Sequence, residues 1–237
     1  PSEAPWYEPL SLLTMIASNT TNIKLATAVL IAPLRNPALL AKTASTLDSI
    51  SKGRLELGVG LGWQKEEFDT AGVSFENRGE IFWETLDICK SLWEDSPISF
   101  KGKYYNFDDI WCHPQPPQGQ NLPLLFGLKM TSENAERIAK IGHGWIPIKT
   151  SRDFISEGKE LLSKAFTKAG REDQPRIRGQ LPTCVDDKGI PNIKLTLQEI
   201  EKSLAAGLNE VEIFPINFVQ APDDIYTILK LISEVKK

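Results

Sequence analysis

The sequence predicts an α/β fold in which a mostly parallel sheet is covered by helices. Three observations predict it. Short apolar segments with strand-like composition alternate with helical segments along almost the whole chain. The strand segments are apolar on both faces, which is typical of strands buried in a parallel sheet. No internal repeat and no linker divides the 237 residues, so we expect a single domain over residues 1–237.

The first part of the chain is expected to run helix, strand, helix, strand. Pro9 suits the first turn of a helix. The β-branched apolar run over residues 23–30 predicts a buried strand. Asn36, followed by proline, predicts the N-cap of a second helix, and Gly53 is expected to end it. Residues 54–60, RLELGVG, predict the next strand.

The rest of the chain continues the alternation after one irregular segment. A long helix is expected after SFENRGE. Residues 96–122 are rich in proline and glutamine, with a hairpin turn at residues 101–103, and we expect this insertion on the substrate side. Thr196 and Glu199 match a capping box that would open a helix closed by Gly207. Four more strands are expected at residues 123–127, 143–148, 176–185 and 210–216.

Composition excludes several classes of function. The 27 lysines and arginines are scattered and the net charge is −4, so we expect no nucleic-acid partner. The longest apolar run, residues 25–34, is about half of the roughly 20 residues of a membrane span, and no signal peptide is visible. We therefore expect a cytoplasmic protein. The cysteines and histidines fit no familiar metal spacing, so we expect reduced thiols and no metal site: Cys89, Cys112, Cys184, His113 and His143.

The segment GRLELGVGLGW raises the question of a nucleotide site. Its glycines, Gly58, Gly60 and Gly62, are spaced G-x-G-x-G. The dinucleotide fingerprint requires G-x-G-x-x-G opening a helix, so a Rossmann-type dehydrogenase is disfavoured. In a (β/α)8 barrel such glycines can leave room for a flat ligand at the carboxyl end of a strand. Equally, small residues can serve only to fill a tight barrel interior, and both interpretations stay open.

The residues resemble a known family. The stretch NIKLATAVLIAPLRNPALLAKTASTLDSISKGRLELGVGLGWQKEEFDTAGVSFENRGE is similar to the third and fourth βα units of the luciferase-like monooxygenase superfamily. It is closest to the branch predicted to use the deazaflavin coenzyme F420. SFKGKYYNF, PQPPQ and AERIAKIGHGWIP continue the match, which runs from about Trp6 to past Pro147. The resemblance implies a luciferase-like TIM barrel, of which about six of eight strands fall in this sequence.

The resemblance also implies a place for the cofactor ring. A non-prolyl cis peptide at Ala28–Val29 would support the ring from behind. Leu61 and Gly62 would lie along the ring edge. Trp63 stands where the sugar-phosphate dehydrogenase branch has a catalytic glutamate, so that acid–base role is missing. We expect Trp63 to be a wall of the substrate pocket or, alternatively, a core residue, and no catalytic residue is assigned.

The phosphate end of the cofactor is expected at the loop that opens the helix after residue 131. The residues concerned are Lys129, Met130, Thr131 and Ser132. Backbone N–H groups at a helix start favour anions, although simple N-capping would explain the hydroxyl side chains equally well. Arg35 could reach an acidic tail or lie on the surface. We expect Glu66 and Glu67 to be solvated.

These observations lead to one main hypothesis and two alternatives. The main one is an F420-dependent oxidoreductase, with FMN as the alternative cofactor, acting by hydride transfer or monooxygenation on an unidentified small organic substrate. The alternatives are a non-catalytic flavin binder or carrier and, less favoured, a Rossmann-type NAD(P) dehydrogenase.

The resemblance implies elements that this sequence does not contain. In the family a first strand, first helix and second strand precede the equivalent of Tyr7. We expect them upstream of this sequence. Alternatively, the chain is naturally shortened and completed by a partner, or it is a degenerate binder. An open barrel exposes apolar strand edges, so we expect a homodimer.

Overall fold

A computed structural model describes residues 7–219, 221 and 223–235, which group into two compact units. Unit 1 comprises the chain up to Gly127 together with Ile141–His143. Unit 2 comprises Leu128–Lys140 and the chain from Gly144 onward. Trp6, where the family resemblance begins, lies outside the described residues. That the whole chain forms a single domain stays a prediction.

The strands of the larger sheet of unit 1, β1, β2, β3 and β6, are parallel. β1 (Leu25–Ala26) and β2 (Leu30–Ile31) both pair with β3 (Leu55–Gly60). β3 in turn pairs with β6 (Leu124–Gly127), so that Gly60 lies opposite Gly127. Every residue of β3 is buried. The single strand predicted over residues 23–30 is therefore two short strands, separated by a break that bears on the site.

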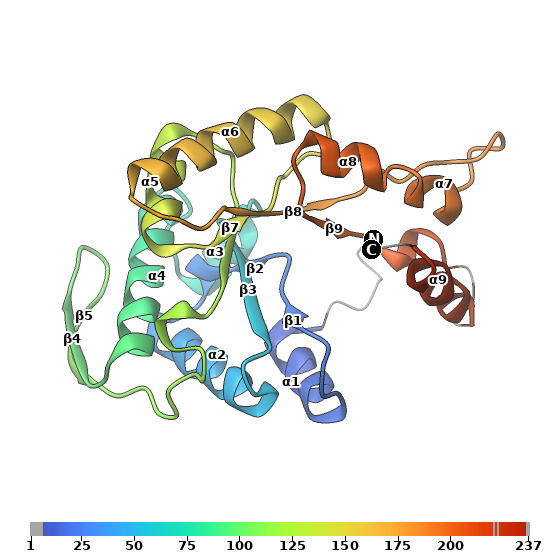
Figure 1. Cartoon of the computed structure of the whole chain (residues 1–237). Helices are drawn as coiled ribbons and strands as arrows, with labels where there is room; N and C mark the ends of the chain where they lie inside the picture. Colours follow the sequence, from blue (N-terminus) through green and yellow to red (C-terminus); the bar gives the residue numbers. More distant parts are fainter. Residues whose placement is uncertain (1–6, 220, 222, 236–237) are drawn as a thin grey trace. The chain divides into compact units, whose positions relative to one another are not determined.

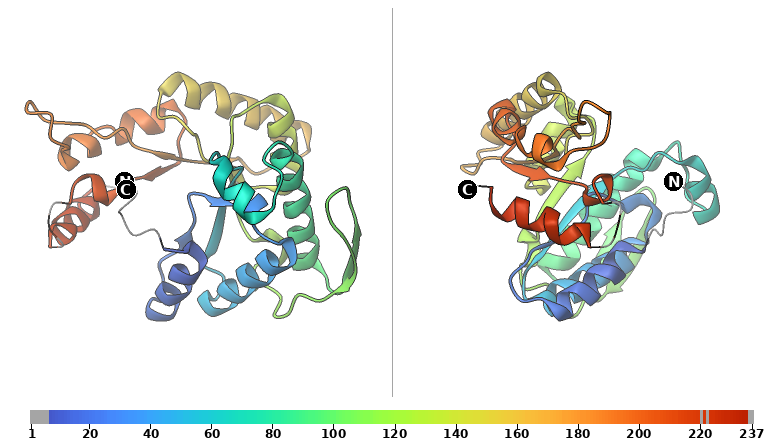
Figure 2. Two further views of the ribbon diagram at one scale, coloured as in Figure 1. Left: turned by 180° about the vertical axis from the view of Figure 1, so that it is seen from behind. Right: turned by 90° about the vertical axis from the view of Figure 1, so that its right-hand side faces the viewer.

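Helices cover the sheet of unit 1. They are α1 (Pro9–Asn19), α2 (Pro37–Ser51), the short α3 (Lys65–Ala71) and α4 (Arg78–Glu94), with a 3-10 turn at Ala32–Leu34. α1 and α2 lie side by side (Figures 1 and 2). α2 also packs against α4, where the indole Nε1 of Trp93 donates to the carbonyl of Ala41 at 3.0 Å.

Local signals set the ends of α1 and α2. Pro9 is the first residue of α1, as predicted, and the Glu8 side chain accepts the backbone N–H groups of the first turn. The Asn36 side chain accepts from the N–H groups of residues 38 and 39 at 3.0 and 3.2 Å, confirming it as the N-cap of α2. Lys52, at φ 57°, takes the left-handed cap, and Gly53 follows at φ 80°.

Residues 96–122 connect the end of α4 to the start of β6. The predicted turn at residues 101–103 belongs to an antiparallel hairpin of β4 (Ile98–Lys101) and β5 (Asn106–Ile110). The carboxylate of Glu84 on α4 accepts three backbone N–H groups of this hairpin, at 2.8–3.0 Å. The chain then passes a 3-10 turn at Gly119–Asn121. These hydrogen bonds attach the hairpin to α4.

Unit 2 repeats the parallel arrangement. β7 (Gly144–Trp145) pairs with β8 (Arg176–Gln180), which pairs with β9 (Glu210–Glu212). Trp145 packs against Gly158, where an added Cβ would lie 2.2 Å from the indole ring. The α/β class with parallel strands is thus confirmed in both units. The helices of this unit are α5 (Ser132–Ile141), α6 (Arg152–Lys168), α7 (Ile193–Leu197), α8 (Ile200–Ala206) and α9 (Asp224–Ser233).

The capping box predicted at Thr196 is wrong. The segment forms two short helices instead of one, and Thr196 lies near the end of α7. Its hydroxyl is buried and accepts from the backbone N–H of Cys184 at 3.0 Å. The N-cap of α7 is Asn192, which accepts from the N–H of Leu195. Gly207 closes α8, as predicted.

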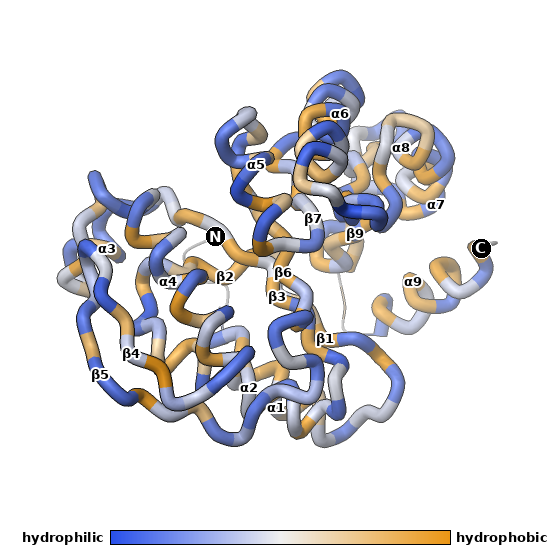
Figure 3. The backbone as a smooth tube through the Cα atoms, turned by 60° about the vertical axis from the view of Figure 1, so that its left-hand side comes forward, coloured by the Kyte–Doolittle hydropathy of each residue, from blue (hydrophilic) through white to orange (hydrophobic). Residues whose placement is uncertain are grey.

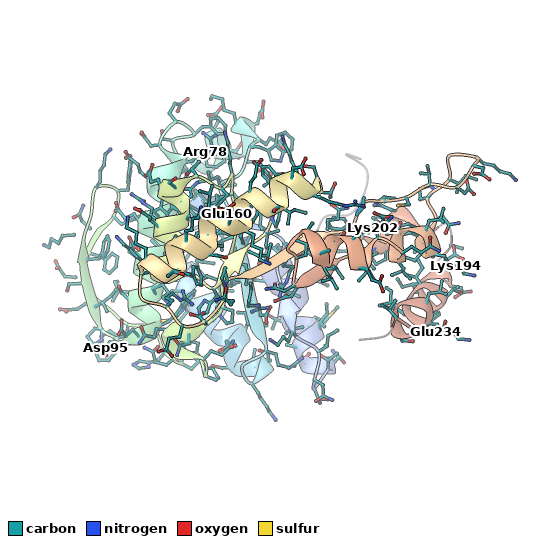
Figure 4. All side chains as sticks on the ribbon, turned by 45° about the horizontal axis from the view of Figure 1, so that its top comes forward. Arg78, Asp95, Glu160, Lys194, Lys202 and Glu234 are labelled. Atoms are coloured by element: carbon teal, nitrogen blue, oxygen red, sulfur yellow. The ribbon has the colours of Figure 1, made fainter. Side chains whose placement is uncertain are left out.

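The long helices of unit 2 are amphipathic. Figure 3 shows hydrophilic and hydrophobic residues alternating along α5 and α6. Glu160 of α6 and Lys202 of α8, labelled in Figure 4, are exposed and pair with Lys164 and Glu199, each at 2.5 Å. In the part of the chain that is described, no helix combines the length and the apolar character that crossing a membrane requires.

Candidate functional site

Unit 1 contains a cavity of about 680 Å³. This volume falls within the roughly 300–1,000 Å³ typical of small-molecule sites. Its walls come from the start of α1, from the segment that joins β1 to β2, and from the residues just beyond β2. The lining residues are Tyr7, Pro9, Leu12, Leu13, Ala26, Thr27, Ala28, Val29, Leu30, Ile31, Leu34, Arg35 and Glu67. Most of them are apolar, which suits an aromatic or aliphatic ligand.

The break between β1 and β2 forms one wall of this cavity. The peptide bond between Ala28 and Val29 is cis, as the family resemblance implies. The neighbouring Thr27 is buried, and its hydroxyl donates to the carbonyl of Gly58 on β3 at 2.8 Å. Val29 is 38% exposed although it is a large apolar residue in the middle of the unit. Its exposed surface lies against the cavity.

Gly60, the last residue of β3, and Gly62 just beyond it make room for protein side chains. A Cβ on Gly60 would lie 2.6 Å from a methyl of Val29. A Cβ on Gly62, whose φ is +77°, would lie 2.8 Å from Ile31 and 2.9 Å from the ring of Phe68. At these two positions protein side chains take up the space beside the glycines, and a flat ligand lying along them stays a prediction. The cavity lies instead on the side of residues 26–31.

Trp63 is exposed and Leu61 is partly buried. The Trp63 side chain is 82% exposed, so the alternative that it is a core residue is excluded. Leu61 and Gly62 are of intermediate exposure. None of these three residues lines the cavity of unit 1. Their places along a ring edge and in a substrate pocket remain predictions.

Two charged side chains, Arg35 and Glu67, line the cavity. Arg35 pairs with Glu8, with 2.8 Å between Nη2 and Oε1. Burial alone would raise the pKa of Glu8, but hydrogen bonds from Ser11 and Leu10 and the charge of Arg35 lower it. Glu67, in the first turn of α3, also lines the cavity and is exposed. Glu66 is exposed too, so both glutamates are solvated, as expected.

The other predicted cofactor residues lie in unit 2. Thr131 directly precedes α5, and its hydroxyl accepts from the N–H of Asn134 at 3.2 Å. The side-chain amide of Asn134 donates to the carbonyl of Lys129 at 2.9 Å. Lys129, Thr131 and Ser132 are exposed, whereas Met130 is buried. N-capping by Thr131 is therefore confirmed, and a contact of this loop with phosphate stays a prediction.

Both histidines contact neighbouring groups of the protein. His143 Nδ1 accepts from the N–H of Leu124, and the N–H of His143 donates to the carbonyl of Leu124 at 2.8 Å. These bonds hold His143 in the bend that precedes β7. His113 is exposed and lies beside Trp111, with 5.5 Å between ring centroids. Within the described residues, no group of histidine, cysteine or acidic side chains could hold a metal ion.

The cysteines are free thiols. Cys89 and Cys112 are buried, and burial raises the pKa of both. A thiol that resists ionisation is a poor nucleophile. These two side chains therefore act as small core residues.

The segment 96–122 makes contacts at the amino end of β3. The amide of Gln118 donates to the carbonyl of Leu55, the first residue of β3, and to the carboxylate of Asp48, both at 2.8 Å. The cavity residues Leu30 and Ile31, by contrast, pair with the carboxyl end of β3. None of these contacts supports the expected substrate-side position of the segment, which stays a prediction.

The sequence analysis missed the contribution of α1 to the cavity. Tyr7, Pro9, Leu12 and Leu13 line it. A signal was present, because Leu12 is an apolar residue that falls outside the helix face shared by Leu10, Leu13 and Ala17. Additional apolar residues beside the buried face of a helix indicate a second contact surface.

Comparison with known proteins gives one family. The model of the luciferase-like monooxygenase family matches residues 2–189. An uncharacterised protein of Mycobacterium tuberculosis is 34% identical over 79% of this chain and 63% of its own length. An F420-dependent glucose-6-phosphate dehydrogenase of Kineococcus radiotolerans is 31% identical over 78% of this chain and 56% of its own length. The chain thus spans less than two thirds of these relatives.

A solved structure agrees with the fold. The oxygenating constituent of 3,6-diketocamphane monooxygenase from Pseudomonas putida, a type II Baeyer–Villiger monooxygenase in complex with FMN, superposes with a TM-score of 0.75. The match covers 96% of this chain and 82% of that chain at 19% identity. At this identity the likeness concerns the fold alone, and it confirms the luciferase-like barrel type.

Proposed function

This chain belongs to the luciferase-like monooxygenase family, and from that premise we propose that it is an oxidoreductase that binds a deazaflavin or flavin ring in the cavity of unit 1. F420 is the first candidate cofactor and FMN the second. The substrate is a small organic molecule that undergoes hydride transfer or monooxygenation. The relatives support both cofactors, since one is named for F420 and a structural neighbour holds FMN.

The observation that carries this proposal is the cavity beside the break between β1 and β2. Its residues fit a flat, largely apolar group. Ala26, Ala28 and Val29 form a wall of small and branched side chains, and the leucines of α1 contribute further apolar surface. Among the described residues, Arg35 and Glu67 are the charged side chains that line it. A flat, largely apolar ring matches this lining.

In this proposal different residues contact the ring, the substrate and the phosphate. The cofactor, when bound, supplies the redox chemistry. The side chains of Ala28 and Val29 support the ring, and the leucines of α1 exclude water from it. Leu61 and Gly62 are proposed to border the ring, and Trp63 the substrate. For unit 2 by itself, Lys129, Met130, Thr131 and Ser132 are proposed to bind phosphate.

The location and small-molecule specificity are proposals as well. We propose a cytoplasmic enzyme, supported by three cysteines that are all free thiols. Neither a nucleic acid nor a membrane is proposed as a partner. Fractionation of cells that express the tagged protein tests the location.

Titration with each cofactor tests the proposal. F420 and FMN are added separately to the protein and followed by their absorbance and fluorescence. We expect saturable binding of F420 with a Kd on the order of 1 μM or below, equivalent to about 8 kcal/mol. FMN binding alone would select the second cofactor. If neither binds, the proposal is wrong.

Two matched variants locate the bound ring. Ala26→Phe introduces a phenyl group into the cavity wall, and we expect the affinity to fall at least about tenfold, or roughly 1.4 kcal/mol. Ala205→Phe makes the same change at an exposed position of α8 in unit 2 and should leave the affinity unchanged. Equal affinities of all three proteins would place the ring elsewhere.

A further inference from the structure

The two charged side chains that line the cavity of unit 1 differ in their partners. Arg35 comes from the segment just beyond β2 and Glu67 from α3. Arg35 is paired, with 2.8 Å between its Nη2 and Oε1 of Glu8. Among the residues that the structure describes, none forms an ion pair or a hydrogen bond with the Glu67 carboxylate. Glu67 therefore gives the cavity a negative charge that these residues do not compensate.

Glu8 is held in place as the partner of Arg35. Its carboxylate also accepts the backbone N–H groups of Leu10 and Ser11, at 3.3 and 2.7 Å, and so caps α1. Burial would raise the pKa of Glu8, but these hydrogen bonds and the charge of Arg35 lower it, so Glu8 is ionised at neutral pH. An anionic ligand at Arg35 would have to displace a carboxylate that the chain itself positions there.

α3 also carries a lysine, but that cation is paired on its own helix. The Lys65 ammonium donates to both carboxylate oxygens of Asp69 at 2.7 Å. Phe68 anchors α3, since it is fully buried and a Cβ on Gly62 would lie 2.9 Å from its ring. Successive residues of a helix point in directions about 100° apart. Glu67 can therefore border the cavity while its neighbour Phe68 packs into the interior of the unit.

We propose that the substrate of this cavity is an amine with an apolar body, whose protonated nitrogen binds the Glu67 carboxylate. The inference rests on the proposed function, because it names the substrate class of the same cavity. Most of the lining is apolar, so an aliphatic or aromatic body fits it. A hydrogen bond between an ammonium and a carboxylate is roughly twice as strong as one between neutral groups. A hydroxyl would gain less from Glu67, and a ligand carboxylate would be repelled by it.

Isothermal titration calorimetry with three compounds of similar shape tests the proposal. Cyclohexylmethylamine, cyclohexylmethanol and cyclohexanecarboxylate share a ring and differ in charge, and each is titrated into the full chain at neutral pH. We expect the amine to bind at least about tenfold more tightly than the alcohol, and the carboxylate to bind most weakly. Added salt should narrow the difference between amine and alcohol, because Glu67 is exposed to solvent.

Two adjacent glutamates provide the variant and its matched control. Glu67→Gln should weaken binding of the amine at least about tenfold and leave binding of the alcohol unchanged. Glu66→Gln removes the same charge from the preceding residue, which is exposed but is not among the residues that line the cavity. This control should leave all three affinities unchanged. Circular dichroism establishes that both variants are folded.

The outcomes separate this inference from the proposed function. If the amine binds through Glu67 while neither F420 nor FMN binds, the proposed function is wrong and the amine site stands. Equal affinities for the three compounds, or tighter binding of the carboxylate, would overturn the inference. So would amine binding that Glu67→Gln leaves unchanged, or a failure of all three compounds to bind.

Discussion

Val29 shows how one side chain determines the role of the glycines around it. Its two methyl groups occupy the space that a Cβ on Gly60 or on Gly127 would need, at 2.6 and 2.8 Å. These two glycines lie opposite each other on β3 and β6. Because Gly60 and Gly127 have no side chains, Val29 can pack against both of them. This packing fixes the segment between β1 and β2, which forms a wall of the cavity. The shape of the cavity therefore depends on the two glycines through their contacts with Val29.

Gly60→Ala should destabilise the protein by about 1–3 kcal/mol, because the added methyl overpacks the contact with Val29. The free energy of unfolding in urea measures this. Gly79→Ala is the matched control, since no atom lies within 4 Å of its added Cβ. That change should be neutral or stabilise by up to about 1 kcal/mol.

A smaller side chain at position 29 should offset part of the stability that Gly60→Ala loses. Val29→Ala, added to Gly60→Ala, is expected to recover part of the lost stability because it removes the methyl that the new Cβ meets. Equal stabilities of the Gly60→Ala and Gly79→Ala proteins would contradict the packing role assigned to Gly60.

Glu210 and Glu212 lie on the same strand and differ in their ionisation. The Glu210 carboxylate pairs with Arg178 and Arg176, with 2.5 Å between the closest atoms of each pair. Burial would raise the pKa of Glu210, but the hydrogen bonds from these arginines lower it. Burial raises the pKa of Glu212, and the charge of Glu210 adds to that effect.

These opposite shifts predict opposite effects of amide substitution. Glu210→Gln should cost about 2 kcal/mol at pH 7, because it removes hydrogen bonds between charged groups. A carboxyl with a lowered folded pKa stabilises above its ordinary value of 4.5, so this cost should shrink as the pH falls through the folded value.

Glu212→Gln should instead stabilise the protein at neutral pH. A carboxyl with a raised folded pKa contributes stability only at low pH and loses it as the pH rises through the folded value. Unfolding curves at pH 7 and pH 4 measure both variants. A loss of stability in Glu212→Gln at pH 7 would refute the assignment.

At the scale of the element, the residue that directly precedes α5 caps the helix and is also proposed to bind phosphate. Thr131 caps the helix through its bond from Asn134, and the same loop is proposed to hold a phosphate. A helix start can bind an anion and be capped, since several of its N–H groups lack partners within the helix. The helix alone does not distinguish the two roles.

Thr131→Ala should destabilise the protein by about 1 kcal/mol through loss of the cap. If the loop also holds phosphate, the same change should weaken cofactor binding several-fold. Thr131→Ser should retain both properties. Ser151→Ala, at an N-cap position of α6 whose side chain makes no capping bond, is the control. Unchanged cofactor affinity in Thr131→Ala would remove this loop from the cofactor site.

For the molecule as a whole, the sequence predicted the order of elements well. The six predicted strand segments each contain an observed parallel strand, and the hairpin turn at residues 101–103 is confirmed. Such features depend on residues close together in the chain. The family resemblance added the cis bond at Ala28–Val29.

Features that depend on distant contacts could not be predicted. The space beside Gly60 is filled by Val29, a residue in the segment between β1 and β2. Thr196 has the pattern of a cap, but its hydroxyl is used by the distant Cys184. The wall that α1 gives to the cavity likewise arises only when the helix packs beside β1. In each case the local signal was compatible with two structures, and tertiary contacts decided between them.

Hydrogen–deuterium exchange with and without saturating cofactor tests the central claim most directly. If the ring binds in the cavity of unit 1, amide exchange should slow in peptides that cover residues 7–13 and 26–35. The hairpin at residues 98–110 should exchange at the same rate in both states. Unchanged exchange in residues 26–35 with the cofactor bound would contradict the account.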